Sequence, residues 1–164
     1  MSATVYVSLG SNVDREMNIL LALGDMRQVF GRLILSRVYD SVAVGFDGDD
    51  FLNLVAGFET DSDVHEVVFE LREIEDRLGR DRSSPRYSHR SIDLDILTYN
   101  ALELDEPGIQ IPRREILVNA FVLRPLQDLA PDMLHPVVKK SYRELWRAME
   151  PDAVRTDVYD LPLA

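Results

Sequence analysis

Residues 90–97 (Arg-Ser-Ile-Asp-Leu-Asp-Ile-Leu) alternate apolar and polar side chains as a half-buried β-strand requires. The apolar side chains point to one face, which must be buried against a second layer. Asp93 and Asp95 point to the other face, roughly 6.6 Å apart along the backbone, and repel one another unless a cation lies between them. Two Mg²⁺ ions, typically about 3.5–4 Å apart in two-metal sites, would fit there with a polyphosphate. An acidic strand that faces solvent explains the two acids equally well.

A cluster of arginines precedes this strand, at Arg80, Arg82, Arg86 and Arg90. The formal net charge of −11 argues against general nucleic-acid binding, which needs a field of the opposite sign. A local cationic cluster can still bind phosphate, because the guanidinium fork binds phosphate oxygens in pairs and keeps its proton. The alternative for each arginine is a solvated loop charge.

Length and composition set the broad class of the protein. The 164 residues predict one domain, residues 1–164, with a loose tail over 155–164. The absence of cysteine excludes disulfides, thiolate nucleophiles and Cys-ligated zinc. The first residues do not resemble a signal peptide, and no apolar stretch approaches the roughly 20 residues of a membrane helix. We therefore expect a cytoplasmic protein that binds neither membranes nor nucleic acid.

Hydrophobic periodicity predicts alternating strands and helices in the first hundred residues. A first helix is expected from Asp14 as N-cap to Gly31, with Met17, Leu20, Leu21 and Gly24 on one face. A second amphipathic helix is expected over 64–78, with Glu75 at the edge of its apolar stripe. Strands are expected over residues 4–9, 33–39, 51–60 and 90–99.

The resulting βαββαβ order is the ferredoxin-like arrangement, an α+β fold in which an antiparallel sheet carries both helices on one face. C-terminal additions follow this core. Residues 101–108 are expected to form a loop and 109–112 an extended segment, while 118–123 fit either a strand or a helix start. Short helices are expected over 125–130 and 142–149.

The sequence lacks the motifs of several families of phosphate-transferring and hydrolytic enzymes. It contains no G-x-x-x-x-G-K-[ST] loop, no G-x-G-x-x-G after the first strand and no protein-kinase signature. It also lacks a G-x-S-x-G elbow, and its three histidines do not form a zinc motif. Two acids on one strand beside several arginines remain, which favours metal-assisted phosphoryl transfer.

Four local motifs, taken together, resemble the 6-hydroxymethyl-7,8-dihydropterin pyrophosphokinase family over roughly residues 4–136. They are Leu9-Gly10-Ser11-Asn12, Phe51-Leu52-Asn53, the strand over 90–97, and Arg-Pro-Leu-Gln-Asp-Leu-Ala-Pro over 124–131. The R-[ST]-x-D-x-D-[IL] strand is the most specific of them. The resemblance implies a ferredoxin-like fold and transfer of the βγ-diphosphate of ATP to a reduced pterin in folate biosynthesis, leaving AMP.

The resemblance also implies roles for the charged residues. Asp93 and Asp95 match the ligands of two Mg²⁺ ions, and Asp95 also matches a group that assists deprotonation of the pterin hydroxyl. Arg80 and Arg90 match loop arginines that meet the phosphates. Glu75 matches a helix carboxylate placed near the site.

For the pterin, Asn53 matches the amide that reads the ring edge, since an amide supplies both a donor and an acceptor. Phe51 and Phe121 match the aromatics that sandwich the ring, although core packing explains aromatic residues equally well. The remaining matches are Ser41, Val44 and Tyr87 beside the pterin, and Ile96, Gln110, Ile111 and Arg113 beside the nucleotide.

The chain departs from the family pattern at four places. Ser41-Val42 replaces a Thr-Pro, Tyr87-Ser88-His89 replaces a Trp-Gly-Pro, and Asn119 replaces an arginine. Pro112-Arg113 replaces a Pro-His, and an arginine cannot shuttle protons near neutral pH. These changes concern rate and substrate range more than reaction class.

Two other functions fit parts of the pattern. A two-metal nucleotidyltransferase also uses Gly-Ser and an Asp-x-Asp strand, but there the two elements lie close in sequence. A non-catalytic or altered-specificity pterin- or nucleotide-binding protein on the same fold is the other alternative. In each case we expect small-molecule partners and a monomer.

Overall fold

A computed structural model describes residues 2–41, 50–79 and 92–163. The strands are β1 (Ala3–Ser11), β2 (Ile34–Leu35), β3 (Val38–Ser41), β4 (Phe51–Thr60), β5 (Asp93–Tyr99), β6 (Leu104–Glu106), β7 (Ile109–Ile111) and β8 (Thr156–Tyr159). The α-helices are α1 (Arg15–Phe30), α2 (Val64–Arg77), α3 (Ala120–Leu129) and α4 (Tyr142–Met149). Short 3₁₀ helices, η1 (Arg114–Leu117) and η2 (Glu150–Asp152), flank α3 and α4.

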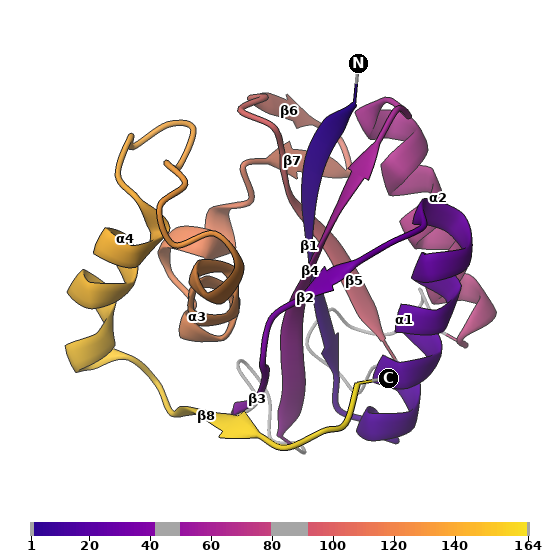
Figure 1. Ribbon diagram of the computed structural model, residues 1–164, viewed down its shortest axis with the longest axis horizontal. Coiled ribbons are helices and arrows are strands. Elements are labelled where there is room, and N and C mark those ends of the chain that lie inside the picture. Colours follow the sequence, from indigo (N-terminus) through magenta and orange to yellow (C-terminus); the bar gives the residue numbers. More distant parts are fainter. Residues whose placement is uncertain (1, 42–49, 80–91, 164) are drawn as a thin grey trace.

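The main sheet has the order β5-β1-β4-β3-β8, with β2 paired to β4. Its strand pairs are antiparallel, and β6 and β7 form a separate hairpin. Helices α1 and α2 cover one face, while α3 and α4 lie on the other side (Figure 1). The chain thus forms three layers, in which the C-terminal helices cover part of the face that a bare ferredoxin-like core leaves open.

Two hydrophobic clusters hold these layers together. The larger joins α1 and α2 to alternate residues of β1, β4 and β5, including Val7, Leu54 and Leu94. The smaller joins α3 and α4 to the opposite face through Tyr6 and Val55. Because successive strand residues face opposite sides, Leu94 and Ile96 of β5 enter the first cluster, while the two acids lie on the other face, where Leu97 joins the second cluster.

Helix α2 confirms the predicted amphipathic pattern. Its N-cap Asp63 accepts a hydrogen bond from the Glu66 backbone N–H at 2.9 Å, which satisfies one of the free donors at the helix start. Its buried side chains include Val67, Leu71 and Ile74. The helix ends before Gly79, whose φ of 87° suits glycine.

The buried face of helix α1 is not the face that holds Met17, Leu20 and Leu21. Met17, Leu20 and Leu21 are 64%, 42% and 49% exposed, and the buried residues are Ile19, Ala22, Leu23 and Met26. Apolar residues lie on both sides of this helix, so periodicity alone did not single out the buried side. Asp14 takes the N-cap position in a left-handed conformation without a side-chain cap, and the helix ends at Gly31 as expected.

The second predicted strand, 33–39, is split into β2 and β3. Ser36 lies between them, and its hydroxyl accepts a hydrogen bond from the Val55 backbone N–H at 2.9 Å. The side chain thereby takes a place in the ladder that a backbone carbonyl would otherwise fill.

The C-terminal region also differs in part from expectation. Residues 104–106 are a strand of the β6–β7 hairpin rather than loop, and 118–123 contain the start of a helix, α3. Helix α3 extends past Pro125, which lies in its second turn. Helix α4 is confirmed, with a capping box between Ser141 and Glu144.

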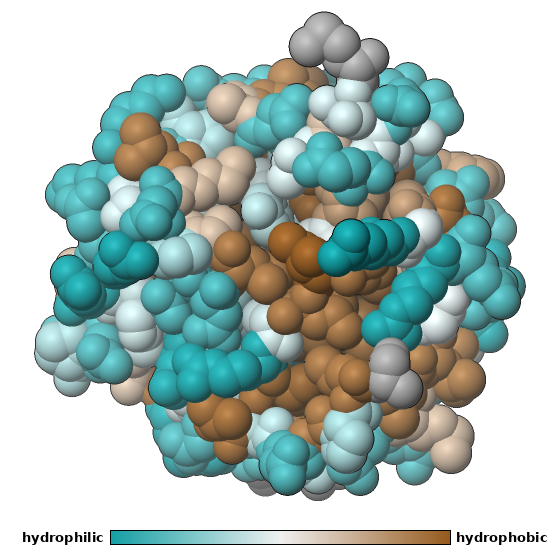
Figure 2. All heavy atoms as spheres, in the orientation of Figure 1, coloured by the Kyte–Doolittle hydropathy of each residue, from teal (hydrophilic) through white to brown (hydrophobic). Residues whose placement is uncertain are grey.

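The expected loose tail from residue 155 is wrong for its first half. Residues 156–159 form β8, which pairs with β3 along its whole length. Beyond it, Leu161 and Leu163 pack against the main core. Figure 2 shows apolar surface gathered where this segment, β2 and α1 meet. Strand β8 pairs with the backbone groups of β3 on the side away from β4, which would otherwise form an open sheet edge. This long-range pairing could not be read from the local sequence.

No helix in the described part of the chain is long and apolar enough to cross a membrane.

A buried histidine makes the turn before α4 sensitive to pH. His135 Nδ1 accepts hydrogen bonds from the backbone N–H groups of Val137 and Val138 at 3.1 and 3.2 Å, and burial lowers its pKa. The neutral ring therefore contributes stability that is complete above its unfolded pKa of about 6.5 and is lost as the pH falls below that value.

We expect the free energy of unfolding to fall more between pH 7.5 and 5.5 in the wild type than in His135→Asn, whose amide oxygen accepts without titrating. Chemical denaturation at the two pH values measures this. His65→Asn is the control, because the hydrogen bond to Glu106 raises the pKa of His65 and gives the opposite sign. An equal pH dependence in wild type and His135→Asn would contradict the prediction.

Candidate active site

The strand register places the acids of β5 and the amide of β4 on one face of the sheet. Asp93 pairs with Gly10 of β1, and Gly10 pairs with Asn53 of β4. Asp95 pairs with Ser8 in the neighbouring row. Residues opposite one another in antiparallel strands share a face, so both acids and Asn53 lie on the side of α3. The glycine separates an acidic region from an amide region.

The lack of a side chain at Gly10 leaves room for the Asn53 side chain. A Cβ added there would lie 2.9 Å from Asn53 Oδ1 and 3.7 Å from Phe51 Cδ1. The missing side chain therefore lets the Asn53 carbonyl oxygen lean over β1. The sequence motif Leu9-Gly10-Ser11-Asn12 thus has a local steric reason.

The sequence resemblance predicts that Asn53 binds a pterin. On that prediction we expect Gly10→Ala to push the Asn53 amide away and to raise the KM for the pterin roughly tenfold, because small displacements at a binding site are costly. Steady-state kinetics with each substrate in turn measures this. Gly24→Ala is the matched control, since a Cβ at that exposed helical position meets nothing within 4 Å. Equal KM values in the wild type and Gly10→Ala would contradict the prediction.

The Asn53 side chain is buried and oriented by a hydrogen bond. Its Nδ2 donates to Ser41 Oγ at 2.6 Å, and the two residues are 4% and 1% exposed. Ser41 pairs with Phe51, which is half-buried. These three predicted pterin residues are therefore brought together by β3 and β4.

Glu75 supports the acidic strand from the sheet edge. Its side chain is fully buried, and Oε2 accepts a hydrogen bond from the Leu94 backbone N–H at 2.8 Å. Arg72 Nη1 lies 3.3 Å from the other carboxylate oxygen. Because Leu94 lies between the two acids, Glu75 fixes the backbone that carries both. Its observed contacts are those of a positioning residue.

Arg113 places a cation beside Asp95. Its backbone N–H bonds to the Leu97 carbonyl at 2.9 Å, which ties the segment after β7 to β5. Its Nη2 lies 3.6 Å from Asp95 Oδ2 and 2.8 Å from Glu115 Oε2. The sequence pointed to Arg113 through its motif position but gave no signal for Glu115, which lies two residues further on in η1.

The far side of the site is formed by α3. Phe121 is half-buried and packs against the smaller core cluster. One turn later, the Arg124 guanidinium lies 4.8 Å from the centre of the Tyr39 ring. Tyr39 Oη donates to Asp128 at 2.6 Å, and burial raises its pKa. Asn119 is the N-cap of α3 without a side-chain cap bond.

The predicted nucleotide residues divide into two groups. Ile96 and Ile111 are 6% and 3% exposed and belong to the larger core cluster, so only their backbones are available to a ligand. Gln110 is half-buried on β7. Val44, Arg80, Tyr87 and Arg90 lie outside the described residues, and their roles stay predictions.

The residues present fit a magnesium site. Asp93 and Asp95 are partly exposed on one face, and carboxylate oxygens are the ligands that Mg²⁺ prefers. Within the described ranges no group of three or more candidate ligands is found. Two carboxylates are nevertheless sufficient for Mg²⁺, which commonly keeps waters and takes its remaining ligands from substrate phosphates. The Arg113 guanidinium already lies 3.6 Å from the Asp95 carboxylate.

Comparison with known proteins shows the family to which the chain belongs. The model of the family described as 7,8-dihydro-6-hydroxymethylpterin-pyrophosphokinase (HPPK) matches residues 6–131. The chain belongs to this family. The match begins in β1 and ends just after α3, so it contains every HPPK motif identified in the sequence.

Two bacterial relatives within the HPPK family are similar over most of their length. The 2-amino-4-hydroxy-6-hydroxymethyldihydropteridine pyrophosphokinase of Aquifex aeolicus is 32% identical over 144 residues, covering 87% of this chain and 89% of that protein. The protein of the same name from Pseudomonas aeruginosa is 37% identical over 140 residues, covering 83% of this chain and 86% of that one.

Solved structures confirm the fold. Wild-type HPPK-DHPS of Plasmodium falciparum with pteroate matches 92% of this chain with a TM-score of 0.72 and 14% identity. An HPPK-DHPS in complex with substrates matches 93% with a TM-score of 0.72 and 12% identity. The chain spans 44% of each of those longer chains. At this identity the likeness shows the fold alone, and the predicted ferredoxin-like core is confirmed.

Proposed function

We propose that this member of the HPPK family transfers diphosphate from ATP to 6-hydroxymethyl-7,8-dihydropterin, giving AMP and the pterin diphosphate in folate biosynthesis. The observation that carries the proposal is the row across the sheet in which Asp93 and Asn53 face the same side with Gly10 between them. An acidic region suits metal-bound phosphates, and a fixed amide suits the edge of an amino-keto ring.

In the reaction the pterin hydroxyl oxygen attacks the β-phosphorus of ATP. The new O–P bond forms as the bond between the β-phosphorus and the α,β-bridging oxygen breaks, and AMP leaves with the electron pair. Asp95 accepts the hydroxyl proton as a general base. Bound Mg²⁺, held by Asp93 and Asp95, would supply positive charge to the phosphate oxygens. Arg113, already beside Asp95, adds a fixed charge that needs no reorganisation.

On the pterin side, the Asn53 amide is oriented before substrate arrives. Because its Nδ2 donates to Ser41, its Oδ1 remains as the acceptor over Gly10. A ring N–H or exocyclic amino group of the pterin donates to that oxygen. Phe51 and Phe121 contact the two faces of the ring, where aromatic stacking is favourable.

The finer features belong to the same proposal. Two Mg²⁺ ions are proposed because the two acids each present a carboxylate to one face. Arg80 and Arg90 are assigned to the phosphates, Tyr87 and Val44 to the pterin, and the backbones of Ile96 and Ile111 with Gln110 to the nucleotide. We also propose a cytoplasmic monomer whose residues 1–164 act as one domain.

The test is a direct assay of AMP. Purified protein with ATP, Mg²⁺ and 6-hydroxymethyl-7,8-dihydropterin is expected to form AMP and pterin diphosphate in equal amounts, measured by chromatography. ATP without pterin is the control for simple hydrolysis.

A second measurement separates the enzyme from a binding protein on the same fold. Mg²⁺ with nucleotide should raise the free energy of unfolding by mass action, by about 2.7 kcal/mol at a hundredfold excess over Kd, and the melting temperature should rise with it. Such a shift without AMP, at high enzyme concentration, would favour the non-catalytic alternative. The absence of both would reject the site.

A further inference from the structure

The C-terminal strand β8 lies beside the strand that orients the pterin amide. Ser41 of β3 pairs with Thr156 of β8, and the Ser41 hydroxyl accepts the hydrogen bond from Asn53. The amide is therefore connected to the C-terminal strand through one side chain and one backbone pair. No sequence motif pointed to this region.

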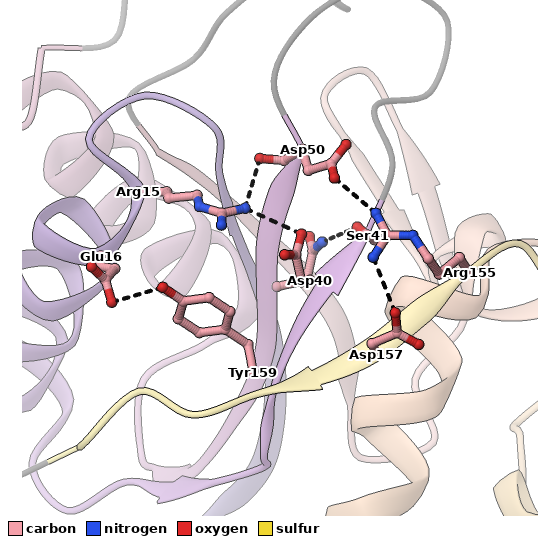
Figure 3. Close-up of polar contacts among 9 residues, drawn as sticks. Arg15, Glu16, Asp40, Ser41, Asp50, Arg155, Asp157 and Tyr159 are labelled. Atoms are coloured by element: carbon pink, nitrogen blue, oxygen red, sulfur yellow. Dashed lines mark hydrogen bonds and ion pairs between the residues drawn. The ribbon is translucent and has the colours of Figure 1, made fainter.

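Arg155, just before β8, joins that strand to the start of β4. Its Nη2 lies 2.7 Å from Asp50 Oδ2, and its Nη1 lies 3.1 Å from Asp157 Oδ2 (Figure 3). Asp50 immediately precedes Phe51, while Asp157 belongs to β8 itself. One guanidinium thus fixes the distance between the C-terminal strand and the chain that enters the pterin region.

A second arginine holds the same place from the other side. Arg15 Nη1 donates to Asp40 Oδ1 at 3.1 Å and to the Asp50 carbonyl oxygen at 3.2 Å (Figure 3). The Arg15 guanidinium also lies 5.2 Å from the centre of the Tyr159 ring of β8. Arg155, just before β8, therefore holds the Asp50 side chain, and Arg15 of α1 holds the Asp50 backbone.

The same strand contacts the helix that carries Phe121. The Thr156 carbonyl oxygen accepts a hydrogen bond from Arg124, three residues after Phe121 on α3. Residues three apart on a helix lie on neighbouring positions of one side. Strand β8 therefore contacts β3 and α3, and Arg155 just before it contacts the entry to β4. These three elements carry the described pterin candidates.

We propose that Arg155 is a positioning residue for the pterin side of the site and that β8 forms its outer wall. This inference rests on the proposed function. Arg155 acts through Asp50 and Asp157 rather than by touching substrate. Its side chain is 44% exposed, and exposed ion pairs contribute little to global stability, so its expected effect is on geometry.

The test compares substrate affinities in three variants. Arg155→Ala should raise the pterin Kd roughly tenfold, while the Kd for ATP with Mg²⁺ and the melting temperature stay at the wild-type values. Arg155→Lys should recover part of the loss, because an ammonium can pair with one carboxylate but cannot fork between two. Arg143→Ala is the matched control, since Arg143 on α4 is also 44% exposed and pairs with Asp132 at 2.9 Å.

Pterin affinity is measured by fluorescence titration with a non-hydrolysable ATP analogue, and AMP formation by the wild type is measured alongside. An unchanged pterin Kd in Arg155→Ala, an equal loss of ATP affinity, or the same loss in Arg143→Ala would overturn the inference while the wild type still forms AMP. A wild type that neither forms AMP nor binds pterin would reject the proposed function and this inference with it.

Discussion

Asp95→Asn is expected to reduce AMP formation at least about 10³-fold while leaving the fold intact, because it removes the proposed metal-ligating carboxylate and the proposed general base together. The asparagine keeps the shape of the side chain but cannot accept the pterin proton or carry the negative charge. The partly exposed pair with Arg113 at 3.6 Å contributes little to folding. The melting temperature of the variant should therefore stay close to that of the wild type.

The measurement is single-turnover AMP formation, with thermal unfolding on the same preparations. Asp105→Asn is the matched control, because Asp105 is an exposed acid on a strand of the separate β6–β7 hairpin. Full activity in Asp95→Asn would show that Asp95 is neither the metal ligand nor the general base of the proposed reaction. A large fall in melting temperature would instead assign Asp95 a structural role.

Glu75→Ala is expected to lower the free energy of unfolding by about 2–4 kcal/mol and to reduce activity as well. The variant leaves the Leu94 N–H without its buried acceptor and removes the carboxylate that lies 3.3 Å from Arg72 Nη1. The backbone between Asp93 and Asp95 then loses its support at the sheet edge. Activity should fall because the two carboxylates no longer hold one geometry.

Urea denaturation and AMP formation measure the two effects. Glu75→Gln keeps an acceptor for Leu94 and should lose less stability than Glu75→Ala. Glu73→Ala on the same helix removes a partly exposed carboxylate and should change both quantities little. If Glu75→Ala were as stable as Glu73→Ala, the buried bond to β5 would not support the strand.

Much of the core could be predicted from local patterns. The alternation around Asp93 and the apolar repeat of residues 64–78 each fix which side is buried, because a wrong side would expose several apolar residues at once. In helix α1 the pattern did not indicate the buried side, because apolar residues lie on both sides. Met17 and Leu20 made an apolar side as plausible as that of Ile19 and Leu23, and only the packed sheet distinguishes them.

The candidate site shows the same division. The sequence identified Asp93, Asp95 and Asn53, and the strand register places them on one face. It gave no indication that Glu75 bonds to the Leu94 backbone or that Glu115 holds Arg113, because hydrogen bonds between residues distant in sequence or in irregular segments leave no periodic trace.

By itself, the sequence determined the ferredoxin-like order, the buried face of β5 and the residue types available for phosphate chemistry, since these depend on side-chain spacing along one segment. Only the tertiary structure decided that Gly10 separates the acids from the amide, and that residues 156–159 form a strand against β3 rather than a loose tail. The physical reason is that strand pairing satisfies backbone groups between segments far apart in sequence, and backbone groups are the same in every residue. The local sequence therefore could not show that β8 borders the site.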